Sequence, residues 1–157
     1  MTREIKFRAK IVIDIEPLAM KKGHWVEGHY YEDLQDGEWC SWIQECNDII
    51  HYKVDKDTLG QFTGLLDKNG KEIYEGDIIE IKEIGGYGCK RKGVVEYDVD
   101  DCAFVVRVLP PSWADIVRLS TRVQICADGN CTHEYINQYT VIGNIHDNPE
   151  QLKTETL

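Results

Sequence analysis

The segment from Gly60 to Ile79 constrains the fold more than any other part of this 157-residue chain. Asn69-Gly70 suits a two-residue hairpin turn, because both residue types tolerate the positive φ of a type I′ turn. Glu75-Gly76-Asp77 supplies a second reversal, and Ile78 to Lys82 follow with the partly alternating pattern of a half-buried strand. The segment therefore predicts three strands joined by two tight turns, as in a small β-barrel.

Further strands are predicted on both sides of this segment. Alternating or aromatic-rich runs predict them at residues 4–15, 25–31, 38–43, 47–57, 93–97, 102–108 and 141–145. Asp36-Gly37 predicts another hairpin turn, and the acidic reversal at residues 98–101 predicts that its flanking strands pair as a hairpin. Two short helices are expected, one after Thr132 and one starting at Asn148-Pro149, whereas residues 112–125 suit either a helix or a strand.

Other parts of the chain extend the pattern of the Gly60–Ile79 segment into a family resemblance. The matching segments lie at residues 5–9, 23–28, 93–97, 103–106 and 141–150. Together they resemble the YopX family of small proteins from bacteriophages and prophages of low-GC Gram-positive bacteria. The resemblance implies a mainly β protein with an SH3-like barrel in its second half and a phage or prophage origin, and it assigns no biochemical activity.

The length suits one domain or two small lobes, and it excludes a second large domain. We expect an N-terminal β-rich region over residues 1–59, containing a β-meander, and the SH3-like barrel over residues 60–147. Residues 148–157 then form a short C-terminal tail. A single integrated domain is the alternative to this division.

The charge of the chain bears on its partners and its compartment. A net charge of −10 and a pI near 4.9 argue against binding to nucleic acid, which depends on clustered Lys and Arg. The one dense basic run, residues 90–92, is predicted to be a solvated turn. No signal peptide pattern and no apolar run of membrane-spanning length is present, which predicts a cytoplasmic protein. The family resemblance implies that the cytoplasm is that of a bacterial host. The six cysteines are then expected to be free thiols.

The motifs that carry chemistry are incomplete. Cys126, Cys131 and His133 lack a second ligand pair for zinc, and Gly70 comes too early for a calcium loop beginning at Asp67. The acids at residues 98, 100 and 101 are expected to be solvated in a turn. No phosphate loop, dinucleotide fingerprint or nucleophile elbow is present. We therefore predict a protein that is not an enzyme, with no catalytic residues, no metal site and no cofactor.

An aromatic set in the first half is the best candidate for a binding surface, because large amphipathic rings dominate interface energetics. Strand alternation should divide it, burying Trp25 and turning at least one of the two neighbouring tyrosines outward. The predicted binding residues are Tyr30, Tyr31, Trp39 and Trp42. They favour a protein-interaction module that binds another protein or another copy of itself. The alternatives are a nucleic-acid-associated module or acidic DNA mimic, and a small metal-dependent hydrolase or nuclease.

Overall fold

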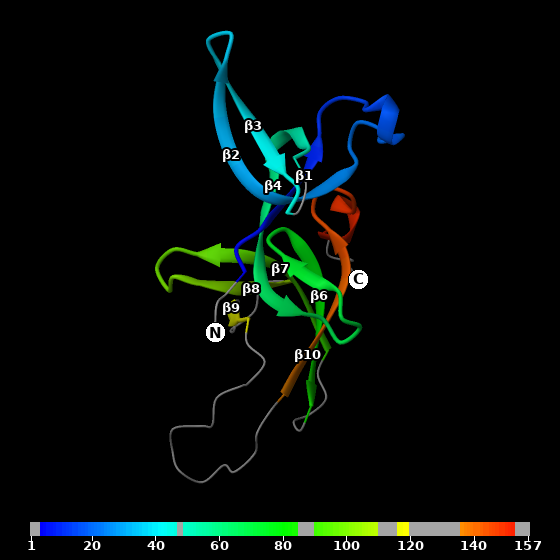
Figure 1. Ribbon diagram of the computed structural model, residues 1–157. Helices are drawn as coiled ribbons and strands as arrows, with labels where there is room; N and C mark the ends of the chain where they lie inside the picture. The colour runs from blue at the N-terminus through cyan, green and yellow to red at the C-terminus, as the bar shows by residue number, and fades with distance from the viewer. Residues whose placement is uncertain (1–3, 47–48, 85–89, 110–115, 120–135, 153–157) are drawn as a thin grey trace. The chain divides into compact units, whose positions relative to one another are not determined.

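The computed structural model describes residues 4–46, 49–84, 90–109, 116–119 and 136–152, and these form a mainly β protein (Figure 1). The chain divides into two compact units, Met1–Gly64 and Leu65–Leu157. The helix predicted after Thr132 and most of the ambiguous residues 112–125 lie outside the described residues. The same is true of Cys89, Cys126, Cys131 and His133.

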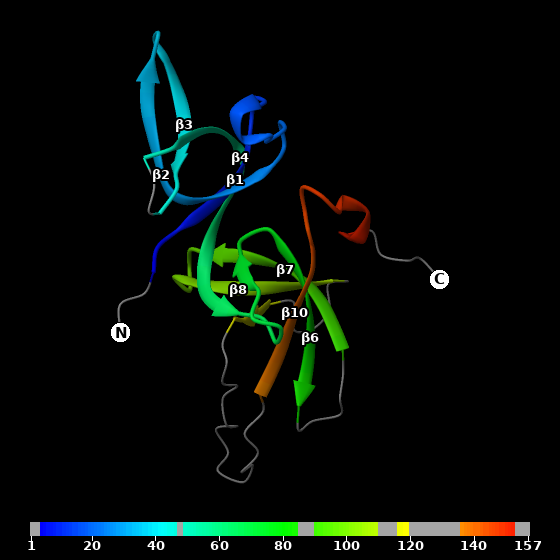
Figure 2. The same cartoon turned by 45° about the vertical axis from the view of Figure 1, so that its right-hand side comes forward.

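The first unit contains a closed four-stranded barrel. Its strands are β1 (Phe7–Ile11), β2 (Trp25–Gln35), β3 (Glu38–Gln44) and β4 (His51–Leu66), with the 3-10 helix η1 (Glu16–Leu18) between the first two. Consecutive strands pair antiparallel, and β1 also pairs with β4, which closes the ring (Figures 1 and 2). The strands predicted to form an N-terminal meander are therefore part of a barrel.

Alternation along the strands places the core of this barrel. The buried side chains are Ala9, Ile11, Val26, Ile43, Tyr52 and Val54. Ile5 lies within the strand predicted over residues 4–15, but it precedes β1 and is 58% exposed. Trp25 was expected to be buried, yet it is half-buried on the outside of the barrel. There the Arg8 guanidinium and the Lys10 ammonium group lie 4.8 Å and 5.3 Å from its ring centroid.

The two hairpin turns predicted from Asx-Gly pairs are both present, but their types differ. Asp36 and Gly37 both have positive φ, 52° and 85°, which confirms the tight turn between β2 and β3. At the second turn only Gly70 has positive φ, so the predicted type I′ geometry is wrong. The amide of Gly70 donates to the Asp67 carbonyl at 3.0 Å, and the Asp67 amide donates to the Lys71 carbonyl at 2.7 Å. This is a longer loop ending in a left-handed glycine.

The second unit contains an antiparallel sheet in the order β10-β6-β7-β8-β9. Its strands are β6 (Asp77–Ile84), β7 (Lys90–Asp98), β8 (Ala103–Leu109), β9 (Ile116–Arg118) and β10 (Ile136–Asn144). The short β5 (Glu72–Tyr74) pairs with the end of β4, and the 3-10 helix η2 (Pro149–Leu152) begins where a helix was predicted. The core consists of Ile73, Ile79, Ile81, Val95, Val106 and Tyr139.

The pairing in this sheet tests two predictions. The hairpin of β7 and β8 is confirmed by seven paired positions from Lys92↔Leu109 to Asp98↔Ala103. The basic run at residues 90–92 lies in β7, paired with β6, so its assignment to a turn is wrong. Within the described part of the chain the end strands β9 and β10 do not pair with each other. The closed barrel thus lies in the first unit. The SH3-like barrel over residues 60–147 stays a prediction.

Two buried carboxylates accept hydrogen bonds from backbone amides at the turns of the second unit. One oxygen of Asp67 accepts the amides of Asn69 and Lys71, at 2.7 Å and 3.0 Å, and the other accepts the amide of Val141 at 3.2 Å. Asp77 accepts the Tyr74 amide at 2.9 Å. These bonds show why the segment that begins like a calcium loop is a hairpin, since its first carboxylate is occupied by backbone donors.

Candidate functional site

The distal half of the β2–β3 hairpin is a two-stranded ribbon, defined here as residues 32–41. In the described pairing, β1 contacts β2 only at Trp25–Gly28, and β4 contacts β3 only at Trp42–Gln44. No third strand pairs with the four pairs from Glu32↔Ser41 to Gln35↔Glu38 among the described residues. Figure 1 shows this hairpin, labelled β2 and β3, extending away from the other strands of its unit.

The pairing register divides the predicted binding residues between two faces of the hairpin. Tyr30 lies opposite the buried Ile43. Trp39, opposite Leu34, lies four pairs further along the hairpin and therefore on the same face. Tyr31 lies opposite Trp42, on the other face. Tyr30 and Trp39 thus share the face that continues into the barrel core, whereas the other two residues do not. The expected outward tyrosine is Tyr31, which is exposed.

An open pocket of about 530 Å³ lies against the ribbon. Residues from β2, β3, β4 and the segment after β1 line it, namely Val12, Glu32, Glu38, Trp39, Cys40, Ser41, Lys53, Val54, Asp55 and Lys56. Trp39 is 72% exposed, and its cross-strand neighbour Leu34 is 54% exposed. The pocket therefore adjoins an apolar pair that is largely open to solvent.

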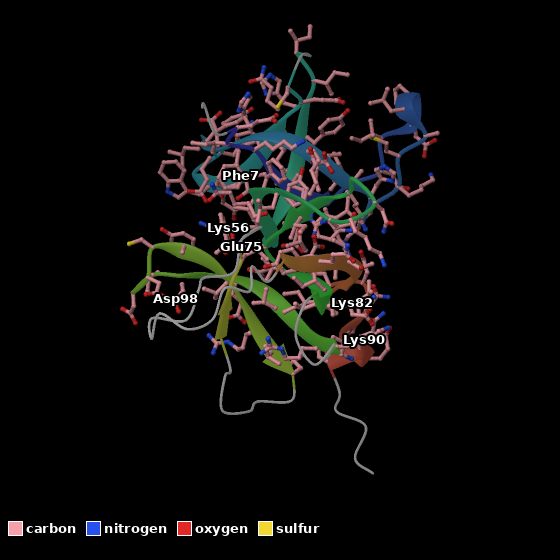
Figure 3. The ribbon with its side chains drawn as sticks, turned by 90° about the horizontal axis from the view of Figure 1, so that it is seen from below. Phe7, Lys56, Glu75, Lys82, Lys90 and Asp98 are labelled. Carbon is pink, nitrogen blue, oxygen red and sulfur yellow. The ribbon has the colours of Figure 1, made fainter. Side chains whose placement is uncertain are left out.

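Three residues that line this ribbon pocket, Glu32, Ser41 and Lys56, belong to one polar network. The Tyr30 hydroxyl donates to a Glu32 carboxylate oxygen at 2.7 Å and lies 3.2 Å from the Ser41 hydroxyl. The Lys56 ammonium group, labelled in Figure 3, donates to the same Glu32 oxygen at 2.6 Å. The bonds from Lys56 and Tyr30 lower the pKa of Glu32, and Glu32 in turn raises the pKa of Lys56. Burial raises the pKa of Tyr30, so its hydroxyl remains a donor at neutral pH.

A bulge in β4 brings Lys56 to this network. Between Arg8↔Gly60 and Lys10↔Asp55 the register of β1 against β4 shifts, so that residues 56–59 loop out. The Thr58 hydroxyl stabilises the bulge, because it accepts the Lys10 amide at 2.9 Å and donates to the Asp55 carbonyl at 2.7 Å. Sequence reasoning did not find Glu32, Ser41 or Lys56. The polar run at residues 55–58, inside an otherwise alternating strand, is the one signal that pointed there.

The opposite face of the hairpin has different contacts. The Tyr31 hydroxyl lies 2.7 Å from Nδ1 of His51, and the two rings meet edge to face. Trp42 is half-buried, with an indole nitrogen that is buried and has no acceptor among the described residues. Sγ of Cys46 lies 3.8 Å from Nε2 of His29. Tyr31 and Trp42 therefore do not contribute to the ribbon pocket.

The chemistry-bearing residues elsewhere have structural contacts. In the β7–β8 turn, whose Asp98 is labelled in Figure 3, that carboxylate accepts the amides of Asp100 and Asp101 at 2.9 Å and 3.1 Å. The described ranges contain no group of three His, Cys, Asp or Glu residues that could hold a metal ion. Cys40, Cys46 and Cys102 are free thiols. No helix in the described ranges has the length and apolar character needed to cross a membrane.

Comparison with known proteins gives a family and a similar solved structure. A family model described as YopX protein matches residues 18–153. The crystal structure of protein EF1440 from Enterococcus faecalis is similar with a TM-score of 0.43 and 22% sequence identity. That alignment covers 97% of this chain and 100% of the other. No curated protein matches the chain.

Proposed function

Since the chain belongs to the YopX protein family, we propose that it is a phage or prophage accessory protein that acts as a non-enzymatic protein-interaction module. Membership of this family was predicted from the sequence and is confirmed by the match over residues 18–153. The module works in the cytoplasm of a bacterial host, needs no cofactor, and binds a protein partner or a second copy of itself through the ribbon.

The exposed pair of Trp39 and Leu34 carries this proposal. A tryptophan that is 72% exposed leaves a large apolar ring in water, which disfavours the free protein and rewards its burial by a partner. Tryptophan is also among the residues that most often dominate the binding energy of protein interfaces. The pocket of about 530 Å³ beside the ring gives a partner side chain a place to enter.

Affinity purification tests the proposal. The tagged chain is expressed in its bacterial host, and the proteins that co-purify with and without nuclease treatment are identified by mass spectrometry. We expect a specific protein that resists nuclease and is lost with Trp39→Ala. The matched control is Val99→Ala, which trims a 75% exposed apolar residue in the second unit and should keep that partner.

The opposite result would exclude this function. Recovery of nucleic acid alone, lost on nuclease treatment, would favour a nucleic-acid-associated module instead. A partner retained equally by Trp39→Ala and Val99→Ala would move the interaction away from the ribbon. Thermal unfolding of both variants checks that each remains folded, and we expect small changes because both side chains are exposed.

A further inference from the structure

We infer that the ribbon recognises a basic segment of a partner protein, with an arginine or lysine side chain stacked on Trp39. This inference rests on the proposed function and specifies the chemistry of the partner. Three observations support it. They are the charge of the hairpin, the cation contacts of Trp25 compared with those of Trp39, and the composition of the adjoining pocket.

The β2–β3 hairpin carries charge of one sign. From Trp25 to Cys46 the sequence contains no Lys or Arg, and its six carboxylates are Glu27, Glu32, Asp33, Asp36, Glu38 and Glu45. All six residues are exposed. Lysines from outside the hairpin pair with two of them, Lys6 with Glu27 at 3.8 Å and Lys56 with Glu32 at 2.6 Å. The carboxylates nearest the tip, on Asp33, Asp36 and Glu38, have no ion-pair partner among the described residues, so a cationic partner complements the ribbon.

The same hairpin already shows how its tryptophans bind cations. The ring of Trp25 has the Arg8 guanidinium at 4.8 Å and the Lys10 ammonium group at 5.3 Å from its centroid. Both distances are within the range of about 6 Å for a cation over an aromatic face. Trp39 has no cation over its ring in the described part of the chain, and it is flanked by Glu38. Its ring is therefore an open position for a cation supplied from outside.

The pocket limits where that cation can lie. Lys53 and Lys56 line its β4 side, and Lys56 is already bonded to Glu32. The Asp55 carboxylate also lines this side, which leaves one positive charge in excess there. This excess disfavours a partner cation on the β4 side and favours the ribbon side, next to Trp39 and Glu38. The aliphatic stem of arginine or lysine can then cover Leu34, which lies opposite Trp39 in the hairpin.

A labelled peptide tests this inference with the full-length chain. The probe is a fluorescein-labelled peptide in which arginine alternates with glycine, compared with the same peptide carrying citrulline or glutamate in place of arginine. We expect anisotropy to detect binding of the arginine peptide, and heteronuclear NMR to show its largest indole shift at Trp39. Trp39→Ala should weaken the binding by about tenfold, while Val99→Ala should leave it unchanged.

A matched pair of double variants separates local recognition from general charge attraction. Asp36→Asn with Glu38→Gln removes two negative charges from the ribbon, and asparagine still tolerates the positive φ of position 36. Asp100→Asn with Asp101→Asn removes the same charge from the β7–β8 turn. We expect the ribbon pair to weaken binding several-fold more than the turn pair. Equal weakening by both pairs would overturn the inference.

Two further outcomes would also overturn it. If the citrulline peptide binds as tightly as the arginine peptide, the positive charge of arginine is not required for recognition. Failure of the arginine peptide to bind, while a co-purifying protein still depends on Trp39, would contradict the basic partner and leave the proposed function in place. If the arginine peptide does not bind and no co-purifying protein depends on Trp39, both the basic partner and the proposed function are excluded.

Discussion

At the scale of single residues, Asp67 determines the geometry of the hairpin that follows β4. Burial alone would raise the pKa of its carboxyl group, but hydrogen bonds from the amides of Lys71, Asn69 and Val141 outweigh this effect and lower it. The ionised carboxylate therefore stabilises the folded state. This contribution is complete above the unfolded-state pKa of about 4 and is lost as the pH falls through the lower pKa of the folded protein.

Replacing Asp67 by asparagine tests this role. Asp67→Asn keeps the shape of the side chain but removes the charge, so we expect a loss of about 2 kcal/mol in the free energy of unfolding at neutral pH. We also expect stability to fall less steeply below about pH 4. Urea unfolding over a series of pH values measures both effects. Asp100→Asn, in an exposed turn, is the control; an unchanged acid dependence in Asp67→Asn would refute the assignment.

At the scale of elements, the β2–β3 hairpin requires glycine at two positions for different reasons. A Cβ atom built on Gly28 would lie 1.9 Å from the carbonyl oxygen of Gln44, because the backbones approach closely there. A Cβ atom on Gly37 would meet no atom within 4 Å, so only its φ of +85° opposes a side chain. The first position is limited by space and the second by backbone conformation.

These two glycines make a matched pair of alanine variants. We expect Gly37→Ala to lower the free energy of unfolding by about 1 kcal/mol, the cost of a left-handed residue with a side chain. Gly28→Ala should lower it by about 3 kcal/mol or more, because the clash is with backbone that cannot move aside without breaking strand pairing. Chemical denaturation gives both values, and similar losses in the two variants would contradict the steric argument.

Elements governed by local chemistry were predictable, and those governed by distant pairing were not. Asp36-Gly37 is a complete signal, since both residue types favour positive φ, and the observed turn agrees. Closure of the barrel depends on the pairing of β1 with β4, which no local pattern encodes. The candidate site follows the same division. Trp39 was found from its residue type, whereas Lys56 reaches Glu32 only because of the bulge in β4.

At the scale of the whole molecule, the net charge of −10 acts together with the ribbon. An acidic protein attracts a basic partner before contact, and dissolved salt screens this attraction. For the arginine peptide we expect the association rate to fall at least several-fold between about 0.02 M and 0.3 M NaCl, with a smaller change in the dissociation rate. Stopped-flow anisotropy measures both rates. A salt dependence confined to dissociation would contradict long-range attraction.

The closure of the barrel by its first strand has a consequence for synthesis on the ribosome. Phe7 pairs with Gln61, so β1 leaves the ribosome long before its second partner exists. Contacts between such distant residues are slow to form, and until then one edge of β1 is open to pairing with other chains. Lys6, Arg8 and Lys10 alternate along this segment. Charged side chains on an edge disfavour pairing with another chain. We therefore expect these three residues to reduce aggregation of the nascent protein before β4 is synthesised.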